Sequence, residues 1–380
     1  MIPYGKQWVD DEDIAAVVDV LKSDWLTTGP VVSQFEEAVA EFVGAKHAVA
    51  VNSGTAALHA MMYALGIGYG DEVIVPTLTF AATANCVVFQ GGTPVFVDVQ
   101  PDTLLMDPAA VEAAITPKTQ AIIAVDYAGQ PCDYASLQAI ADEHGIPLLT
   151  DGCHALGARY GETMVGNVTE MTAFSFHPVK PITTGEGGMV TTDNAEFAAK
   201  MRVFRSHGIQ TDARQREEQG TWFYEMQDLG YNYRICDIQC ALGLRQLSKL
   251  PAWIERRQDI ARQYDESFSR SSLIRPLKCH AHVSHGYHLY VVRLRNQDRG
   301  QVFQSLRDAG IGVNVHYIPV HMHPFYRQYF GTYVGQCPVA EAAYECMISL
   351  PVFPRMTDED VLKVISTLSE IMLRTQRRAA

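Results

Sequence analysis

Short apolar segments alternate with helical patterns from about residue 10 to residue 200, and this alternation restricts the fold more than any other feature. Two of the helical patterns have recognisable starts: Ser33 with Glu36 reads as a capping box, and Asp107 precedes Pro108 as an N-cap before a first-turn proline. Strands are expected at 47–51, 72–76, 94–99, 120–126, 146–151, 172–176 and 188–192. Such a rhythm predicts an α/β domain with a mixed, mostly parallel sheet and helices on its faces.

The C-terminal part of the chain has a different pattern and predicts a smaller α+β domain. It is preceded by a long polar stretch at 209–228, typical of a surface loop or a subunit-contact arm. A long helix, two strands and a helix between these strands are then expected, at 236–270, 287–294, 312–318 and 298–309. We place the boundary near residue 249, inside the long helix, which gives a large domain at 1–248 and a small one at 249–380.

Charge and cysteine usage exclude several classes of protein. With 43 acidic and 30 basic residues, the formal charge of −13 repels a phosphate backbone and argues against a nucleic-acid partner. No segment reaches the roughly 18 apolar residues of a membrane span, and the polar, acidic N-terminus is unlike a signal peptide. The eight cysteines include no C-x-x-C pair. We therefore expect a cytoplasmic protein with reduced thiols that binds neither nucleic acid nor membrane.

The turn V-N-S-G-T at 51–55 lies between an expected strand and an expected helix. Such a turn directs free backbone N–H groups and the positive end of a helix at one point, which suits a phosphate. Gly54 permits close approach, and the hydroxyls of Ser53 and Thr55 can add hydrogen bonds. Because the same residue types commonly cap helices, the turn alone leaves both interpretations open.

Asp151 is the first charged residue after the apolar run I-P-L-L-T, so it lies at the carboxyl end of an expected strand. Ligands bind at this end of the strands in open α/β sheets. A partly desolvated carboxylate there requires a cationic partner, although a helix N-cap is the alternative. His154, three residues further on, is by itself more often structural than catalytic.

Lys180 lies in the segment F-S-F-H-P-V-K-P-I-T-T-G-E-G-G at 174–188, bracketed by Pro178 and Pro181. A lone lysine is usually a solvated surface charge. Here its neighbours are aromatic, proline and glycine residues with one acid, Glu186, which favours a buried and reactive amine. A phosphate cradle, a strand-end carboxylate and a semi-buried lysine are together the groups that pyridoxal phosphate (PLP) requires.

These residues also resemble a known family, the DegT/DnrJ/EryC1/StrS sugar aminotransferases, which are PLP-dependent transferases of fold type I. The resemblance extends in order over nearly the whole chain. Its motifs are S-G-T-x-A-L at 53–58, P-T-x-T-F at 76–80, D-x-x-H-x-x-G at 151–157, S-F-H-x-x-K at 175–180 with G-E-G-G at 185–188, F-R-S-H-G at 204–208 and G-Y-N-Y-R at 230–234.

The resemblance implies a role for each cofactor residue. Lys180 would form the Schiff base with PLP and move the proton at the reacting carbon, and Asp151 would pair with the ring nitrogen. His154 would lie near the phenolic oxygen, and Phe80 would stack on the ring, a core aromatic being the alternative. The phosphate would be held by Ser53, Gly54, Thr55 and Ser175, and by Asn232 of a neighbouring subunit, so that the active sites of a homodimer are shared.

Within the family, V-D-Y-A-G at 125–129 and D-G-C-H-A-L-G at 151–157 look most like the transaminase of the pseudaminic-acid branch. That branch implies amino transfer from L-glutamate to C4 of a UDP-linked 4-keto-6-deoxy-N-acetylhexosamine. Many family members carry Gln where this chain has His154, and His-x-Tyr-Gly where it has Asp126 to Gly129. The sugar-nucleotide contacts implied by the resemblance are Thr27, Thr28, Gly29, Arg234, His316 and Tyr317.

Several alternatives differ from this interpretation. The first is an aminotransferase that acts on another UDP-, dTDP- or GDP-linked 4-keto-sugar. The second is a PLP-dependent sugar dehydratase. Lys180 argues against the dehydratase, because dehydratases of the family replace the lysine with histidine. A catalytically silent binding protein and a nicotinamide dehydrogenase are disfavoured by the intact residue set and by the missing G-x-G-x-x-G. The histidine-rich runs at 279–285 and 321–323 fit no standard zinc spacing, so no metal is expected.

Overall fold

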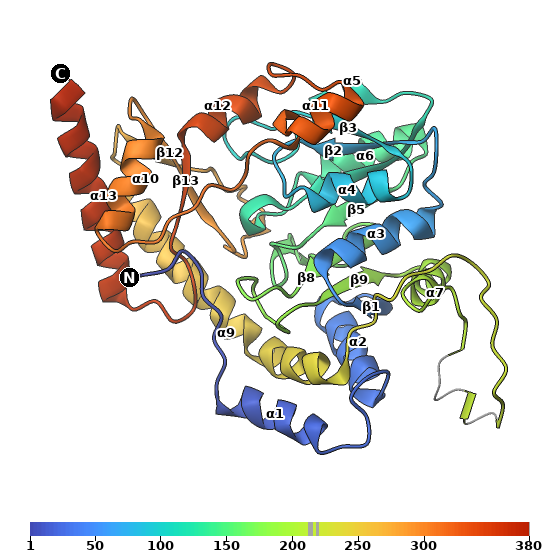
Figure 1. Ribbon diagram of the computed structural model, residues 1–380. Helices are drawn as coiled ribbons and strands as arrows, with labels where there is room; N and C mark the ends of the chain where they lie inside the picture. Colours follow the sequence, from blue (N-terminus) through green and yellow to red (C-terminus); the bar gives the residue numbers. More distant parts are fainter. Residues whose placement is uncertain (212–215, 218–219, 380) are drawn as a thin grey trace.

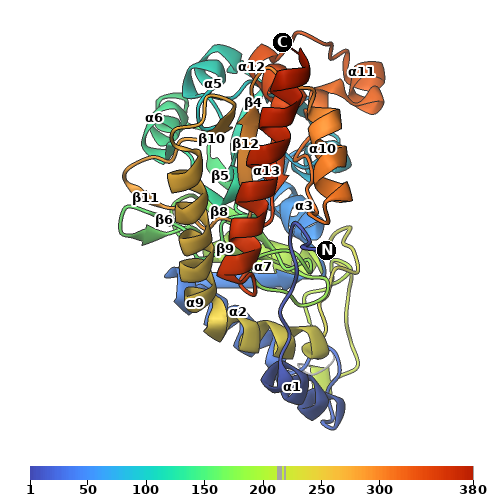
Figure 2. The same ribbon diagram turned by 90° about the vertical axis from the view of Figure 1, so that its left-hand side faces the viewer.

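The computed structural model describes residues 1–211, 216–217 and 220–379 (Figures 1 and 2). Its centre is a seven-stranded sheet in the order β1-β9-β8-β5-β4-β2-β3. Strand β9 is antiparallel to both neighbours and the remaining pairs are parallel, so the sheet is mixed and mostly parallel, as expected. The strands are β1 (His47–Val51), β2 (Glu72–Pro76), β3 (Thr93–Val97), β4 (Thr119–Val125), β5 (Leu148–Asp151), β8 (Met171–Ser175) and β9 (Gly188–Thr192).

Helices cover both faces of this sheet (Figure 1). Successive side chains of strand β1 point to opposite faces of the sheet. Ala48 and Ala50 pack in the apolar cluster with α2 and α9, whereas Val49 and Val51 pack in the cluster with α3 and α7. The helices of this part are α1 (Asp11–Leu21), α2 (Pro30–Val43), α3 (Gly54–Leu65), α4 (Ala82–Phe89), α5 (Pro108–Ala114), α6 (Tyr134–His144), α7 (Ala195–Phe204) and the first half of α9 (Asp237–Phe268), with the short 3-10 turn η1 (Tyr127–Gly129).

A smaller unit is built on the antiparallel sheet β10-β12-β13. Its apolar cluster joins this sheet to the second half of α9 and to two further helices. The elements are β10 (Ile274–Pro276), β12 (Tyr290–Leu294), α10 (Arg299–Asp308), η2 (Val320–Met322), α11 (Pro324–Phe330), α12 (Pro338–Cys346), β13 (Met347–Leu350) and α13 (Asp358–Ala379). A third small sheet, β11-β6-β7, joins β6 (Arg159–Tyr160), β7 (Thr163–Met164) and β11 (Val283–Ser284).

The strand expected at 312–318 is wrong. These residues pair with β13 through one isolated bridge, between Asn314 and Ser349. The backbone N–H of Gly312 instead donates to the carbonyl of Ile2 in the N-terminal segment. The apolar alternation is real, since Val313 is buried in the small-unit cluster, but the chain then leaves β13 and passes to the large unit.

The capping box expected at Ser33 and Glu36 is also wrong, because α2 begins three residues earlier, at Pro30. Its N-terminal N–H groups are satisfied from far away: Asp237, in the first turn of α9, accepts from the backbone of Gly29 at 2.8 Å and of Val31 at 3.0 Å. Glu36 is buried inside the helix and pairs with Arg205. The N-cap expected at Asp107 is confirmed, with Pro108 following it.

Helix α9 runs through both parts of the molecule (Figure 2). Residues such as Leu250 and Ile254 pack in the cluster of α2, whereas Ile260 and Tyr264 pack in the cluster of the small unit. The domain boundary near residue 249 stays a prediction. In the described part of the chain, no helix combines the length and the apolar character needed to cross a membrane.

The polar stretch at 209–228 is described in part, because residues 212–215 and 218–219 lie outside the described residues. Beyond them, Trp222, Phe223 and Tyr224 are exposed to solvent, Trp222 by 85%. Large aromatic side chains in such a position are more typical of a contact surface than of a free loop.

Candidate active site

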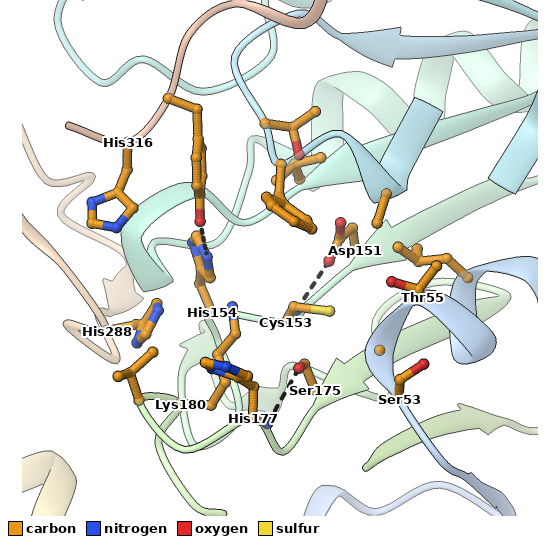
Figure 3. A pocket seen from close by; sticks show the side chains of 18 of the residues that line it. Ser53, Thr55, Asp151, Cys153, His154, Ser175, His177, Lys180, His288 and His316 are labelled. Carbon is orange, nitrogen blue, oxygen red and sulfur yellow. Dashed lines mark hydrogen bonds between the residues drawn. The ribbon is translucent and has the colours of Figure 1, made fainter. Parts of the chain in front are cut away.

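A cavity of about 490 Å³ lies at the carboxyl-terminal edge of the central sheet (Figure 3). The parallel strands all end at this edge, so the residues that follow β1, β2, β5 and β8 meet there although they are far apart in sequence. Of the residues predicted from the sequence, the cavity is lined by Ser53, Gly54, Thr55, Phe80, Asp151, His154, Ser175, Lys180, His316 and Tyr317.

Lys180 reaches the cavity from a turn after β8, in which its backbone N–H donates to the carbonyl of His177 at 2.9 Å. Its side chain points toward His154 and Cys153 (Figure 3). Burial lowers the pKa of Lys180, while Cys153 and Asp151 act in the opposite direction. A larger fraction of the amine is therefore neutral near pH 7 than for an exposed lysine, and the neutral amine is the nucleophile.

Asp151 is the last residue of β5 and is nearly fully buried. Its two oxygens accept from different donors: Oδ1 from the backbone N–H of Cys153 at 3.1 Å, and Oδ2 from the hydroxyl of Thr83 at 2.7 Å. Among the residues that the structure describes, no basic side chain forms an ion pair with it. A buried, oriented carboxylate with neutral donors is suited to a cationic group brought by a ligand.

The turn after β1 forms the opposite side of the cavity. Ser53 caps α3, its hydroxyl accepting from the backbone N–H of Ala56 at 3.1 Å, which leaves the first N–H groups of the helix, at Gly54 and Thr55, without an intrahelical acceptor. A Cβ atom on Gly54 would lie 2.8 Å from Cβ of Ser175, so only glycine allows this approach. Capping and phosphate binding, the two interpretations of this turn, are thus compatible.

Phe80 and Tyr317 both line the cavity, and their rings are in contact, with centroids 5.9 Å apart. Phe80 is 59% exposed, so it is not a core aromatic. Tyr317 also contacts His154, whose Nε2 lies 3.0 Å from the tyrosine hydroxyl. Because the backbone N–H of Ala128 donates to Nδ1 of His154 at 3.3 Å, Nε2 carries the proton and donates to Tyr317. Burial, aided by Lys180, lowers the pKa of His154 and keeps the ring neutral.

Five of the predicted residues lie outside the cavity of their own chain. Asn232 is exposed and its backbone bridges to Ser206. Residues 27–29 lie beside the start of α9, where Thr27 bridges to Cys236, two residues after Arg234. A Cβ atom on Gly29 would lie 2.5 Å from Cβ of Trp25 and 2.6 Å from the Asp237 carboxylate, so local packing explains this glycine. The residues concerned are Thr27, Thr28, Gly29, Asn232 and Arg234.

Other residues at the site were not predicted. Thr83, on α4, contacts Asp151 across 68 positions of sequence, and His288, which precedes β12, lines the cavity beside His154. Tyr4 and Asn314 also line it. The run T-L-T-F-A-A-T at 77–83, with its three threonines, was the available signal for Thr83, whereas nothing in the local sequence distinguishes His288 from the histidines around it.

The two histidine-rich runs contribute to packing and hydrogen bonding. His285 stacks on Tyr287 with ring centroids 3.8 Å apart, and His321 lies between Thr77 and Glu341. Within the described residues, no group of three or more His, Cys, Asp or Glu side chains is arranged to hold a metal ion.

The cavity fits PLP in three respects. Lys180 offers an amine that can form a covalent link. Asp151 offers a buried carboxylate that forms no ion pair with a described basic side chain and can therefore bind the ring nitrogen. The cavity also offers the N-terminus of a twelve-residue helix beside a small-residue cradle, which suits a phosphate.

Comparison with known proteins gives consistent matches over the chain. The model of the DegT/DnrJ/EryC1/StrS aminotransferase family matches residues 7–369. The spore coat polysaccharide biosynthesis protein SpsC of Bacillus subtilis is 43% identical over 98% of this chain and 97% of its own.

Two solved structures are similar over nearly their full length. The putative sugar aminotransferase Spr1654 of Streptococcus pneumoniae, in its PLP form, has a TM-score of 0.93 and 34% identity, covering 98% of this chain and 99% of that one. PseC of Helicobacter pylori, an aminotransferase involved in the biosynthesis of pseudaminic acid, has a TM-score of 0.90 and 34% identity, with coverage of 98% and 99%. These neighbours share the fold of the whole chain, both units included.

Proposed function

The chain belongs to the DegT/DnrJ/EryC1/StrS aminotransferase family, and from this premise we propose that it transfers the amino group of L-glutamate to C4 of a UDP-linked 4-keto-6-deoxy-N-acetylhexosamine, a precursor of pseudaminic acid. It is a sugar aminotransferase with the fold of type I PLP enzymes, and PLP is its cofactor. The observation that carries the proposal is the meeting of Lys180, Asp151 and the N-terminus of α3 in one cavity.

When bound, PLP withdraws electrons from the carbon that bears the amino group, which makes a proton on that carbon removable. We assign Nζ of Lys180 to the covalent attachment of the cofactor and to the removal and return of that proton. The carboxylate of Asp151, oriented by Thr83 and Cys153, would hold the proton on the ring nitrogen. His154 would lie near the phenolic oxygen, and Phe80 would cover one ring face.

The phosphate would be bound by the free N–H groups of Gly54 and Thr55 and by the hydroxyl of Ser175. We propose that Asn232, and with it Arg234, reaches the cavity of a partner subunit in a homodimer. Support comes from their position outside the cavity of their own chain and from the exposed aromatic residues at 222–224, which are suited to a subunit contact.

The sugar substrate would bind beside Phe80 and the segment that carries His316 and Tyr317, which line the cavity together. PseC supports the pseudaminic-acid precursor as substrate. The higher identity to SpsC, 43% against 34%, favours a second candidate, a nucleotide-linked keto-sugar destined for a surface polysaccharide. Both candidates use the same cavity chemistry and differ in the sugar.

The attachment of the cofactor can be tested directly. Borohydride reduction of the purified protein with PLP should leave a reduced adduct on the peptide that contains Lys180, detectable by mass spectrometry. The Lys180→Ala variant should give no adduct and no turnover while its circular dichroism stays that of the wild type. A colourless protein without an adduct, or an active Lys180→Ala variant, would contradict the assignment.

The substrate is tested with a panel of UDP-, dTDP- and GDP-linked 4-keto-6-deoxy sugars offered with glutamate. We expect the highest kcat/KM for the UDP-linked N-acetyl sugar of the L-arabino configuration. Preference for a dTDP sugar, or for another UDP sugar, would favour the polysaccharide candidate and leave the family assignment intact.

A further inference from the structure

The backbone on either side of Asn232 is paired with the end of α7. The N–H of Tyr231 donates to the carbonyl of Phe204 at 2.7 Å. The N–H of Tyr233 donates to the carbonyl of Arg205 at 3.0 Å. The segment that carries Asn232 is therefore not a free loop, although Asn232 itself is exposed.

The two tyrosines that flank Asn232 pack on α3, the helix whose N-terminus lies at the cavity. Their rings stack on each other, with centroids 5.0 Å apart. His59, a buried residue of α3, contacts Tyr231 at 5.1 Å and Tyr233 at 5.9 Å between ring centroids. Its Nδ1 also lies 3.1 Å from the hydroxyl of Tyr233. Because both neighbours face the helix, Asn232 is left at the surface between them.

Asn52 joins this segment to the phosphate turn of the same chain. Its backbone N–H donates to the carbonyl of Tyr233 at 2.8 Å, and its side-chain amide donates to the carbonyl of Asn232 at 3.3 Å. It is followed directly by the turn at 53–55, which lines the cavity. A single residue thus links the phosphate turn of one cavity to the exposed Asn232.

The peptide unit between Asn232 and Tyr233 is held at both edges. Its carbonyl accepts from the side chain of Asn52, and its N–H donates to the carbonyl of Arg205. Because a peptide unit is planar, bonds at opposite edges fix its orientation, and with it the direction in which the side chain of Asn232 leaves the backbone. Without the side chain of Asn52, the carbonyl edge is released.

We propose that Asn52 is a positioning residue for the active site of the partner subunit, because it holds Asn232 in the orientation that binds the cofactor phosphate there. This rests on the proposed function, in which Asn232 completes the site of a second copy of this chain. A group that is held in its binding orientation beforehand loses less conformational freedom when it binds, so the affinity is higher. Asn52 therefore raises the affinity for PLP of the partner's site and not of its own.

The test uses mixed dimers in which only one site can bind PLP covalently. One subunit carries Lys180→Ala, so the covalent site is that of the other subunit, and the Asn232 that completes it comes from the Lys180→Ala chain. Asn52→Ala is placed either on the Lys180→Ala chain, the partner arrangement, or on the chain of the covalent site, the own-chain arrangement. Two affinity tags isolate each mixed dimer. Borohydride trapping at increasing PLP concentrations, with the adduct on the Lys180 peptide quantified by mass spectrometry, gives the apparent dissociation constant for PLP without any turnover.

In the partner arrangement, the apparent dissociation constant for PLP should rise roughly three- to tenfold over that of the mixed dimer without the Asn52 change, because one orienting hydrogen bond is lost. In the own-chain arrangement it should change by less than about twofold. Asn167→Ala is the matched control, because it removes an asparagine bond to the backbone carbonyl of Gly44 and should change neither constant. A rise confined to the own-chain arrangement, a rise of equal size in both, or a rise in neither would overturn the inference.

Asn232→Ala in the same two arrangements separates a failure of the inference from a failure of the proposed function. With a shared site, this variant weakens PLP binding in the partner arrangement alone, at least as strongly as Asn52→Ala does. Both changes on one chain should then weaken binding little more than Asn232→Ala, since Asn52 acts through Asn232. Fully additive losses would overturn the inference and leave the shared site intact. An Asn232→Ala variant that acts in the own-chain arrangement, or in neither, would contradict the shared site itself, and the role of Asn52 with it.

Discussion

The hydroxyl of Thr83 donates to one oxygen of Asp151 and also pairs with the hydroxyl of Thr79, so it can be removed without changing the charge of the site. In Thr83→Val we expect kcat to fall roughly ten- to a hundredfold, because a hydrogen bond to a charged group contributes about 1.5 to 3 kcal/mol. Steady-state kinetics at saturating substrate measure this. Thr191→Val is the matched control, because it removes the hydroxyl of a buried threonine of β9 that donates to the backbone carbonyl of Gly166. Equal losses of kcat in both variants would show that Thr83 affects the stability of the fold and has no specific effect on catalysis.

Asp151 also acts on Lys180, because its negative charge opposes the burial that lowers the pKa of the lysine. The amine attacks the cofactor only when neutral, so capture of PLP by the cofactor-free protein should slow as pH falls through the pKa of Lys180. In Asp151→Asn that opposing charge is absent, and the midpoint of the capture rate should move to lower pH. Stopped-flow absorbance over a pH series measures it, with the exposed Asp193→Asn as control. A midpoint that moves upward or stays fixed would contradict the coupling.

At the level of single residues, the sequence was informative where a polar group ends an apolar run. Asp151 and the turn at 53–55 lie after strands, and the parallel topology then brings them together. Thr83 and His288 escaped prediction because their importance depends on contacts across 68 and more positions of sequence. The contribution of Asn232 to another subunit is equally invisible to local patterns and stays a prediction.

Among the elements, the strands of the large sheet and the start of α5 were predictable from local sequence, whereas the start of α2 and the segment at 312–318 were not. Helix α2 takes its cap from Asp237, which is distant in sequence, so no capping motif precedes it. The segment at 312–318 alternates as a strand does, but tertiary contacts with the N-terminal segment replace all but one bridge.

The crossing of α2 and α9 depends on Gly243. A Cβ atom there would lie 2.6 Å from the ring of Phe35 and 2.9 Å from Thr184, which belongs to the loop after Lys180. Gly243→Ala should therefore lower the free energy of unfolding by about 1 to 3 kcal/mol, although alanine is normally the better helix former. Urea denaturation of this variant and of Ser248→Ala, at an exposed position of the same helix, provides the comparison. A stabilised Gly243→Ala variant would show that the crossing is loosely packed.

For the whole molecule, a shared active site predicts complementation. If Asn232 completes the partner's site as proposed, Lys180→Ala and Asn232→Ala should each inactivate a homodimer, but in a mixed dimer one site carries both changes and the other carries neither. After subunit exchange, an equal mixture should regain about a quarter of the wild-type activity, since half of the dimers are mixed. An active-site titration before and after mixing measures this. No recovery, with exchange verified by native mass spectrometry, would assign Asn232 to its own chain or to no site.

Buried neutral histidines predict how stability depends on pH. Burial lowers the pKa of His59 and of His316 to about 4, below the ordinary value of 6.5. Between these values the unfolded chain binds the proton and the folded chain does not, so stability falls as pH decreases from about 6.5 to 4, by up to about 1.4 kcal/mol per pH unit for each histidine. Thermal unfolding from pH 7.5 to 5 should show a shallower slope in His59→Phe. A slope equal to that of the wild type would contradict the shift.

The continuity of helix α9 limits how this enzyme can be divided or recombined. The helix is continuous from Asp237 to Phe268, and its apolar side chains are divided between two cores. A fragment that began at residue 249 would start in the middle of a helix and expose Leu250, Trp253 and Ile254 to water. The C-terminal unit is therefore unsuited to exchange as an independent cassette, and chimaeras between relatives should place their junctions outside this helix.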